Sequence, residues 1–306
     1  MFSFIHDGIF IAILAHGIIG LSLVWDKILL ENPETQDVVN YVFWLGAMSV
    51  LGLCLIPFGF HIPSWRVIGL AFAAGVIQLY ANYFYYNALK LGEASQALAI
   101  MGGFSPLFTY LIAIPLLQQP LGGSSIVGFA LLVAGGFVMF SSEPMNVRVI
   151  IPLVISAAGT FGLSSVLQKM AFNETNFVSA YVIFTLGTFA GALFLLVRRK
   201  WREEIFRTSE QASPRSKELY FINRFANGCG SFLIFYAVSL ASPAIVSAIS
   251  GLRYAIIFLT VYYFTRFHPR VLHERYRGWA LEAKAIGTLL VIAGLVFVGL
   301  GGSGGS

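Results

Sequence analysis

Charged residues are scarce in this sequence. Lys, Arg, Asp and Glu together make up 11% of the 306 residues, whereas a soluble domain has about 25%. Hydrophobic residues make up 58% and form long uninterrupted runs. Most of the surface must therefore face lipid, which indicates a multi-pass membrane protein. The net charge of +5 comes from basic loops between apolar stretches, and membrane orientation explains it better than nucleic acid does.

Cysteine is also scarce, and the residue patterns of common enzyme sites are missing. Cys54 and Cys229 both lie in apolar runs, which predicts helix packing rather than a disulfide or a metal site. The sequence contains no Ser/His/Asp arrangement in register, no metal-spaced His or Cys cluster and no Walker loop. We therefore expect no enzyme activity, no metal and no cofactor. His16 is the one histidine within a span, and packing is its more common role.

Ten apolar stretches are long enough to cross a bilayer, whose core of about 30 Å needs about 20 residues of helix. They cover residues 8–30, 38–58, 65–90, 93–118, 123–141, 147–172, 177–199, 218–240, 243–265 and 281–300. Nothing indicates a strand, and backbone groups in lipid must be satisfied within each span. The sequence predicts an all-α membrane protein of ten transmembrane helices.

Three groups of residues recur in the same order in the two halves of the chain. Residues 20–27 match 162–169, and residues 87–91 match 236–240. The third match pairs Gly128, Leu131, Ala134 and Gly135 with Gly287, Leu290, Ala293 and Gly294. Because each half has an odd number of spans, the halves would insert with opposite orientation, as in many secondary transporters. We expect two inverted five-helix repeats, 1–141 and 147–301, followed by an added glycine–serine linker at 302–306.

These features resemble a known family. Two five-span halves, the phrase ALKLGEASQALAI before a fourth span rich in Gly and Pro, and GFALLVAGGFVM in the fifth span are similar to the drug/metabolite transporter superfamily, EamA type. The resemblance implies a multi-pass transporter of the bacterial inner (plasma) membrane, with spans one, three, four, six, eight and nine around a central cavity. Gln118-Gln119-Pro120 departs from the family, in which many members carry a Glu after the fourth span.

The second departure is Arg253, near the centre of the ninth span. A charge at that depth costs about 2.5 to 3.5 kcal/mol on insertion scales, so it normally faces a water-filled cavity or a buried partner. The alternative is purely structural neutralisation by a carboxylate or by helix-end carbonyls. Asp26 and Glu93 lie near span ends, and no acid is central. An anionic substrate would then neutralise the guanidinium, or waters and carbonyls would solvate it. The planar fork of N–H groups suits a carboxylate or a phosphate. An Arg here resembles the organic-phosphate and nucleotide-sugar branches of the superfamily.

Amide side chains recur at helical spacing on two spans related by the repeat. Gln78, Asn82 and the Tyr85/Tyr86 pair share one face of the third span. Asn223, Asn227 and Ser231 do so in the eighth, with Arg224 beside them. Such faces line a shared midplane site, or they form interhelical hydrogen bonds worth about 0.6 kcal/mol each. The predicted substrate-binding residues are Arg253, Gln78, Asn82, Tyr86, Asn223, Arg224 and Asn227.

Two lysines and two helix breaks complete the prediction. Lys27 and Lys169 lie at equivalent span ends, where we expect them either at the two entrances or reaching to the interface. Asp26 would partly neutralise the adjacent Lys27. Residues 102–106, with two Gly and one Pro, and Ser250-Gly251 are expected to break the fourth and ninth spans at matching places, as in transport sites. Close helix packing is the alternative for these small residues.

The orientation in the membrane follows from the basic loops. Arg and Lys residues cluster after the seventh span, at 198–217, and after the ninth, at 266–277. The positive-inside rule then places these loops in the cytoplasm and both termini outside. The family resemblance implies the reverse, with cytoplasmic termini.

The predicted function is secondary transport of a small organic anion, a carboxylate or a phosphate-bearing metabolite, by alternating access. The alternatives are an exporter of amino acids or drug-like metabolites, and a flippase or scramblase of anionic lipid headgroups. A receptor-like or structural membrane protein would lack a polar midplane cavity. The expected partners are the small-molecule substrate and membrane lipids, without nucleic acid, and a homodimer is compatible with the sequence.

Overall fold

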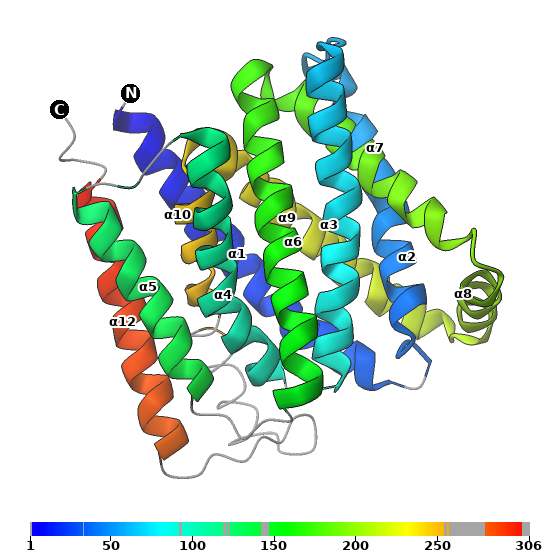
Figure 1. Ribbon diagram of the computed structural model, residues 1–306. Coiled ribbons are helices and arrows are strands. Elements are labelled where there is room, and N and C mark those ends of the chain that lie inside the picture. Colours follow the sequence, from blue (N-terminus) through cyan, green and yellow to red (C-terminus); the bar gives the residue numbers. More distant parts are fainter. Residues whose placement is uncertain are drawn as a thin grey trace.

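The fold is built from helices. We describe a computed structural model over residues 2–32, 34–91, 94–118, 121, 123–141, 147–253, 256 and 279–301, and these residues contain no strand. The elements are α1 (Phe2–Glu31), α2 (Val38–Met48), η1 (Ser49–Phe58), α3 (Trp65–Leu91), α4 (Ala94–Leu117), α5 (Gly123–Ser141), α6 (Val147–Glu174), α7 (Phe177–Leu195), α8 (Arg199–Gln211), α9 (Pro214–Leu240), α10 (Pro243–Ala248) and α12 (Trp279–Gly301). Figure 1 shows α5 and α12 side by side at one edge of the molecule and α8 at the opposite edge.

Five segments are long and apolar enough to cross a membrane. They are Asp7–Leu30, Val38–Phe58, Trp65–Leu91, Ile150–Glu174 and Phe177–Leu195. Shorter apolar helices cover Phe104–Leu117, Gly123–Val138 and Ala285–Gly294. The chain is an integral multi-pass membrane protein. Residues 254–255 and 257–278, which hold most of the expected second half of the ninth span and its basic loop, lie outside the described residues.

Polar residues mark where three of the helices begin. Asp37, Asn176 and Ser213 are the N-caps of α2, α7 and α9, and each side chain accepts a hydrogen bond from a backbone N–H three residues on. Such caps satisfy amide groups that have no partner within the helix. At the start of α9 the Glu34 carboxylate also accepts hydrogen bonds from the Ser213 N–H, at 3.0 Å, and from the Ser213 hydroxyl, at 2.7 Å. The loop after α1 is thereby attached to the start of α9.

Helix α8 was not predicted. The seventh span ends at Leu195 rather than near residue 199, and a short helix follows from Arg199 to Gln211. The helix is amphipathic, because it buries Ile205 while its charged residues face outward. Ser209 accepts a hydrogen bond from Trp44 Nε1 at 2.8 Å and donates one to Asn40 Oδ1 at 2.8 Å. These bonds attach α8 to α2.

The two halves of the chain pack against each other through corresponding helices. Helix α1 packs against α9, and α6 packs against α3, so the first span of each half meets the third span of the other. A similar exchange holds between α5 and α12. A Cβ at Gly135 would lie 2.8 Å from the Gly287 carbonyl oxygen, and a Cβ at Gly294 would lie 2.8 Å from that of Gly128. In the repeat alignment each of these two contacts is the counterpart of the other.

The predicted helix breaks are found in one span of the two. Helix α4 is continuous from Ala94 to Leu117, with Pro106 and Pro115 inside it, so the expected break in the fourth span was wrong. In the ninth span α10 stops at Ala248, and Ile249 and Ser250 form a turn. Helices tolerate proline in a membrane where neighbouring groups satisfy the freed carbonyls. Pro106 and Pro115 are therefore compatible with an unbroken α4.

Candidate functional site

A polar cavity lies at the centre of the bundle. Six helical segments line it, namely α1, α3, α4, α6, α9 and the stretch from α10 to Arg253. These correspond to spans one, three, four, six, eight and nine, the set that the family resemblance implies. The cavity measures about 130 Å³, which is smaller than the roughly 300 to 1,000 Å³ of a typical small-molecule site. In this conformation it can enclose a small polar group.

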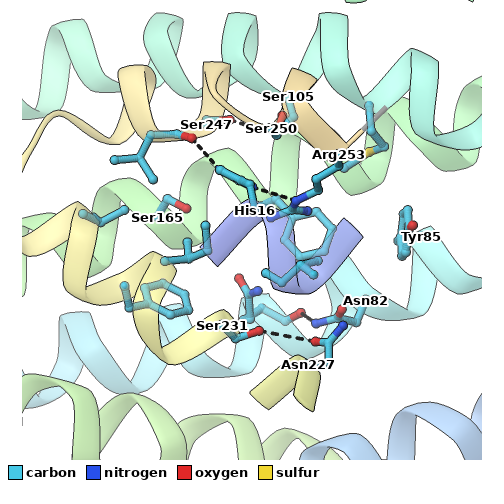
Figure 2. A pocket seen from close by; sticks show the side chains of 18 of the residues that line it. His16, Asn82, Tyr85, Ser105, Ser165, Asn227, Ser231, Ser247, Ser250 and Arg253 are labelled. Atoms are coloured by element: carbon cyan, nitrogen blue, oxygen red, sulfur yellow. Dashed lines mark hydrogen bonds between the residues drawn. The ribbon is translucent and has the colours of Figure 1, made fainter. Parts of the chain in front are cut away.

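Arg253 lies at this cavity together with His16. The Arg253 Nε donates a hydrogen bond to His16 Nδ1 at 2.7 Å, and His16 Nε2 lies 2.8 Å from the carbonyl oxygen of Val246. Figure 2 shows these two side chains on one side of the pocket, with Asn82, Asn227 and Ser231 on the other. Because Nδ1 accepts, the proton of a neutral imidazole must be on Nε2, where it is donated to Val246. One histidine thus connects the arginine to the backbone of α10.

The turn after α10 explains why the Val246 carbonyl needs a donor. The backbone N–H groups of Ser250, Leu252 and Arg253 bond to the carbonyl three residues earlier, as in a 3₁₀ helix, rather than four. The Ser250 N–H therefore goes to Ser247 instead of Val246. His16 supplies the missing donor, since an unpaired carbonyl in the bilayer interior costs several kcal/mol.

The amide residues face Arg253 from the two repeat-related helices. Gln78, Asn82 and Tyr86 of α3 line the cavity, as does Asn227 of α9. Asn82 Nδ2 donates to the Gln78 carbonyl at 2.8 Å, and Asn227 Nδ2 donates to Ser22 Oγ at 3.3 Å. The predicted gathering of Arg253 with these four side chains is present in the structure.

Asn223 and Arg224 belong instead to a buried charged cluster. Arg224 is 4% exposed and Asp26 is 0% exposed, and the Arg224 Nη2 forms an ion pair with Asp26 Oδ1. The carboxylate also accepts hydrogen bonds from Asn223, from the Tyr41 hydroxyl at 2.7 Å and from the Tyr86 hydroxyl at 3.2 Å. Asp26 does lie near the end of the first span beside Lys27, as expected, but the sequence analysis did not predict its ion pair with Arg224. Asp26 is the buried partner of an arginine on the other half.

Three tyrosine rings enclose the arginine of this cluster. The Arg224 Cζ lies 4.9 Å from the ring centre of Tyr41, 5.5 Å from that of Tyr86 and 5.8 Å from that of Tyr220. Arg224 Nη1 also donates to the Tyr86 hydroxyl at 2.7 Å. Aromatic faces attract cations most strongly where water is excluded. Three rings therefore cover the guanidinium, although Arg224 also contributes to the lining of the groove described below.

The charged cluster and the cavity are connected by hydrogen bonds. Ser22 Oγ donates to Asn223 Oδ1 at 2.8 Å and accepts from Asn227, which lines the cavity. Tyr86 belongs to both sites. The cluster lies toward the end of the molecule formed by the α1–α2 loop and the α8–α9 corner, where Glu34 meets Ser213. It therefore lies between the cavity and that end of the molecule.

Of the two predicted entrance lysines, the structure describes the side chain of Lys169 and not that of Lys27. Lys169 is 7% exposed, and its Nζ donates to the Ser239 carbonyl at 2.9 Å. Its ammonium group is therefore held by a backbone carbonyl near the end of α9. A role at an entrance stays a prediction.

A larger groove lies beside the cavity. It measures about 570 Å³ and is formed by α2, η1, α3, α7 and α9. Most of its lining is apolar, with residues such as Leu51, Phe184 and Phe225. Five residues line both spaces: Gln78, Asn82, Asn227, Ser231 and Phe235. Sequence reasoning missed this groove, because it is formed by the packing of five segments rather than by any single pattern.

Comparison with known proteins finds one matching family and a set of similar folds. Residues 6–141 match the EamA-like transporter family. No curated protein matches the chain. Among solved structures 28 chains match, and one crystal structure of a protein with no stated function has a TM-score of 0.59 over 96% of each chain at 16% identity. That likeness shows a shared fold.

Proposed function

We propose that this chain, an EamA-type member of the drug/metabolite transporter superfamily by the match of residues 6–141, is a secondary transporter of a small organic anion. We place it in a bacterial inner membrane and expect it to work by alternating access. One observation carries the proposal. Arg253 faces a central cavity across from amide side chains of both halves, Gln78 and Asn82 on α3 and Asn227 on α9.

The cavity is chemically suited to a carboxylate or a phosphate. A guanidinium presents a planar fork of N–H donors that matches either group in two-point contact. The bond from Nε to His16 fixes the plane of this fork, so less conformational entropy is lost when an anion binds. The amide groups of Gln78, Asn82 and Asn227 donate to further anion oxygens. Together they make Arg253 the charged anchor and the amides the groups that select shape.

Alternating access requires the cavity to be closed on one side at a time. The cluster of Asp26, Arg224 and the three tyrosines ties α1 of the first half to α9 of the second. It would act as the closed gate on the α8 side, and opening would separate the two charges. The reciprocal glycine contacts of α5 and α12 support the two-fold repeat on which such an exchange depends.

The proposal is tested by transport in proteoliposomes. We compare the wild type with Arg253→Gln, using counterflow of labelled lactate, glycerol phosphate and alanine. We expect the variant to lose at least tenfold in uptake of whichever anion the wild type carries, while Arg253→Lys keeps part of it. Alanine as the one cargo would favour the amino-acid exporter, in which Arg253 holds the carboxylate alone.

The matched control is Arg66→Gln. Arg66 forms a surface ion pair with Glu174 at 3.3 Å on the far side of the bundle from α8, and its removal should leave uptake within twofold of the wild type. Equal uptake by the wild type and Arg253→Gln for every anion carried would overturn the proposal.

A further inference from the structure

We propose that the groove between α2–η1, α7 and α9 binds the alkyl chain of a single-chain amphiphilic anion, which enters from the bilayer. The headgroup, one phosphate or carboxylate, would lie against the polar residues that the groove shares with the central cavity. The inference rests on the proposed function and narrows its substrate class.

The groove borders the lipid-facing surface. Two of its walls, Val38–Phe58 and Phe177–Leu195, are segments long and apolar enough to cross a membrane. Leu51 on η1 is 53% exposed and Phe225 on α9 is 63% exposed, and both line the groove. In a membrane these exposed side chains contact acyl chains rather than water. A ligand with an alkyl tail can therefore reach the groove sideways without leaving the hydrocarbon.

The groove and the cavity are separated by a single layer of side chains. Gln78 and Asn227 line both spaces. The Oε1 of Gln78 is buried without a hydrogen-bond partner among the described residues. A terminal amide offers both a donor and an acceptor group, and turning it over exchanges them. Gln78 can therefore present its NH₂ group to a headgroup arriving from the groove.

A charged donor lies at the same place. Arg224 lines the groove while 96% of its surface is covered, and its Nε is buried with no partner in the described part of the chain. Nη1 and Nη2 are occupied by Tyr86 and Asp26. A buried N–H of a guanidinium without an acceptor is costly. An anionic oxygen at the inner end of the groove would satisfy it after a shift of the side chains that cover Nε.

The volumes of the cavity and the groove favour a ligand with a single alkyl chain. The central cavity, about 130 Å³, is too small for a typical ligand, whereas the groove, about 570 Å³, lies within the range of roughly 300 to 1,000 Å³. A ligand that places its headgroup at the shared wall and its tail in the groove uses both. The volume suits one alkyl chain, so we commit to a single-chain anion rather than a two-chain phospholipid.

Photo-crosslinking of the protein in lipid nanodiscs tests this inference. The probe is dodecyl phosphate that carries a diazirine in its chain, and peptide mass spectrometry locates the adducts. We expect saturable adducts on residues 48–55 and 225–235. Tenfold excess dodecyl phosphate should reduce them about tenfold, whereas ethyl phosphate, which has the same headgroup and no long tail, should reduce them less than twofold.

A matched pair of glycine variants identifies the groove itself. A Cβ at Gly228, which lines the groove, or at Gly69 on α3 would meet no atom within 4 Å, so both positions accept a Cβ without a clash. Gly228→Phe would fill the groove and lower the saturable adducts at least fivefold. Gly69→Phe, outside the groove, would leave them unchanged.

Each remaining outcome overturns the inference. Adducts that are not saturable, or that spread evenly over the lipid-facing helices, would mean contact with bulk lipid only. Equal competition by ethyl phosphate would mean a site for the headgroup alone. Crosslinking requires binding but no turnover, so such a failure leaves the proposed transport of anions to be judged by Arg253→Gln.

Discussion

At the scale of single residues, the most consequential pair is Asp26 and Arg224. A buried ion pair adds little stability compared with an apolar pair of the same size, but removing one partner leaves an uncompensated charge. Here the carboxylate also serves Asn223, Tyr41 and Tyr86. Its loss would therefore disturb several donors at once.

We predict that Asp26→Asn and Arg224→Met each lower the stability of the purified protein by about 3 to 5 kcal/mol. The double variant should lose much less than the sum of the two, because no unpaired charge remains. Thermal unfolding in detergent for the four proteins of this cycle gives the coupling. Additive losses would mean that the two side chains do not form the pair described above.

At the scale of elements, the loop after α1 is held to the start of α9 by Glu34. Hydrogen bonds from the hydroxyls of Ser216 and Ser213, and from the Ser213 N–H, lower the pKa of Glu34 from 4.5 to about 2. A carboxylate whose pKa is lower in the folded state stabilises the fold above its unfolded pKa. That stability is lost as the pH falls from about 4.5 toward 2.

Glu34→Gln should therefore unfold at a lower temperature than the wild type at pH 7, and the difference should shrink between pH 4.5 and pH 3. Parallel melting curves at pH 7, 4.5 and 3 measure this. The same difference at all three values would show that the charge of Glu34 has no part in attaching the loop.

Helices α3 and α7 approach each other so closely that glycine is required at the crossing. A Cβ at Gly75 would overlap the carbonyl oxygen of Phe184, and a Cβ at Gly187 would overlap that of Phe72. The obstructing atoms are backbone, so they cannot move aside as a flexible side chain can. Contacts between small residues of this kind are a main source of helix association in membranes.

We predict that Gly75→Ala destabilises the protein by at least about 1 to 3 kcal/mol, the usual range for overpacking. Gly69→Ala on the same helix has open space around it and should be neutral or stabilising by about 0.5 to 1 kcal/mol, since alanine favours the helix. Melting temperatures of the two variants give the comparison. A similar effect at both positions would contradict the close approach.

Hydropathy predicted the positions and lengths of most helices from the sequence. Most predicted spans match the described helices within a few residues, because the bilayer sets a minimum apolar length. Helix α8 was missed because its charges resemble a loop. The spacing of Trp201, Ile205 and Phe206 was the available signal.

The candidate site was predictable in part for a related reason. Helical spacing brought Gln78, Asn82 and Asn227 to one cavity with Arg253. The pairing of Arg224 with Asp26 depends on how α1 rests against α9, which no local pattern records. His16 was interpreted as a packing residue. Its hydrogen bond to Val246 depends on which carbonyl oxygen the turn after α10 leaves without a donor, and only the structure identifies that carbonyl.

At the scale of the whole molecule, the contact of α5 with α12 offers a test of the repeat, because each helix contributes the equivalent glycine. Gly135 and Gly294 occupy equivalent positions, and each meets a carbonyl of the partner helix. We predict that Gly135→Val and Gly294→Val destabilise the protein by equal amounts, within about 0.5 kcal/mol, the ordinary uncertainty of such comparisons. Unequal losses of several kcal/mol would show that the two halves do not use this contact equivalently. Melting curves recorded side by side provide the measurement.

The burial of Asp26 and Arg224 also makes the proposed carrier sensitive to temperature. If the α8 side opens, both ions gain hydration shells, and the ordering of that water makes ion hydration less favourable as temperature rises. Warming would then hold this gate shut and cooling would loosen it. The resting balance between inward- and outward-facing forms would shift with the temperature at which the cell lives.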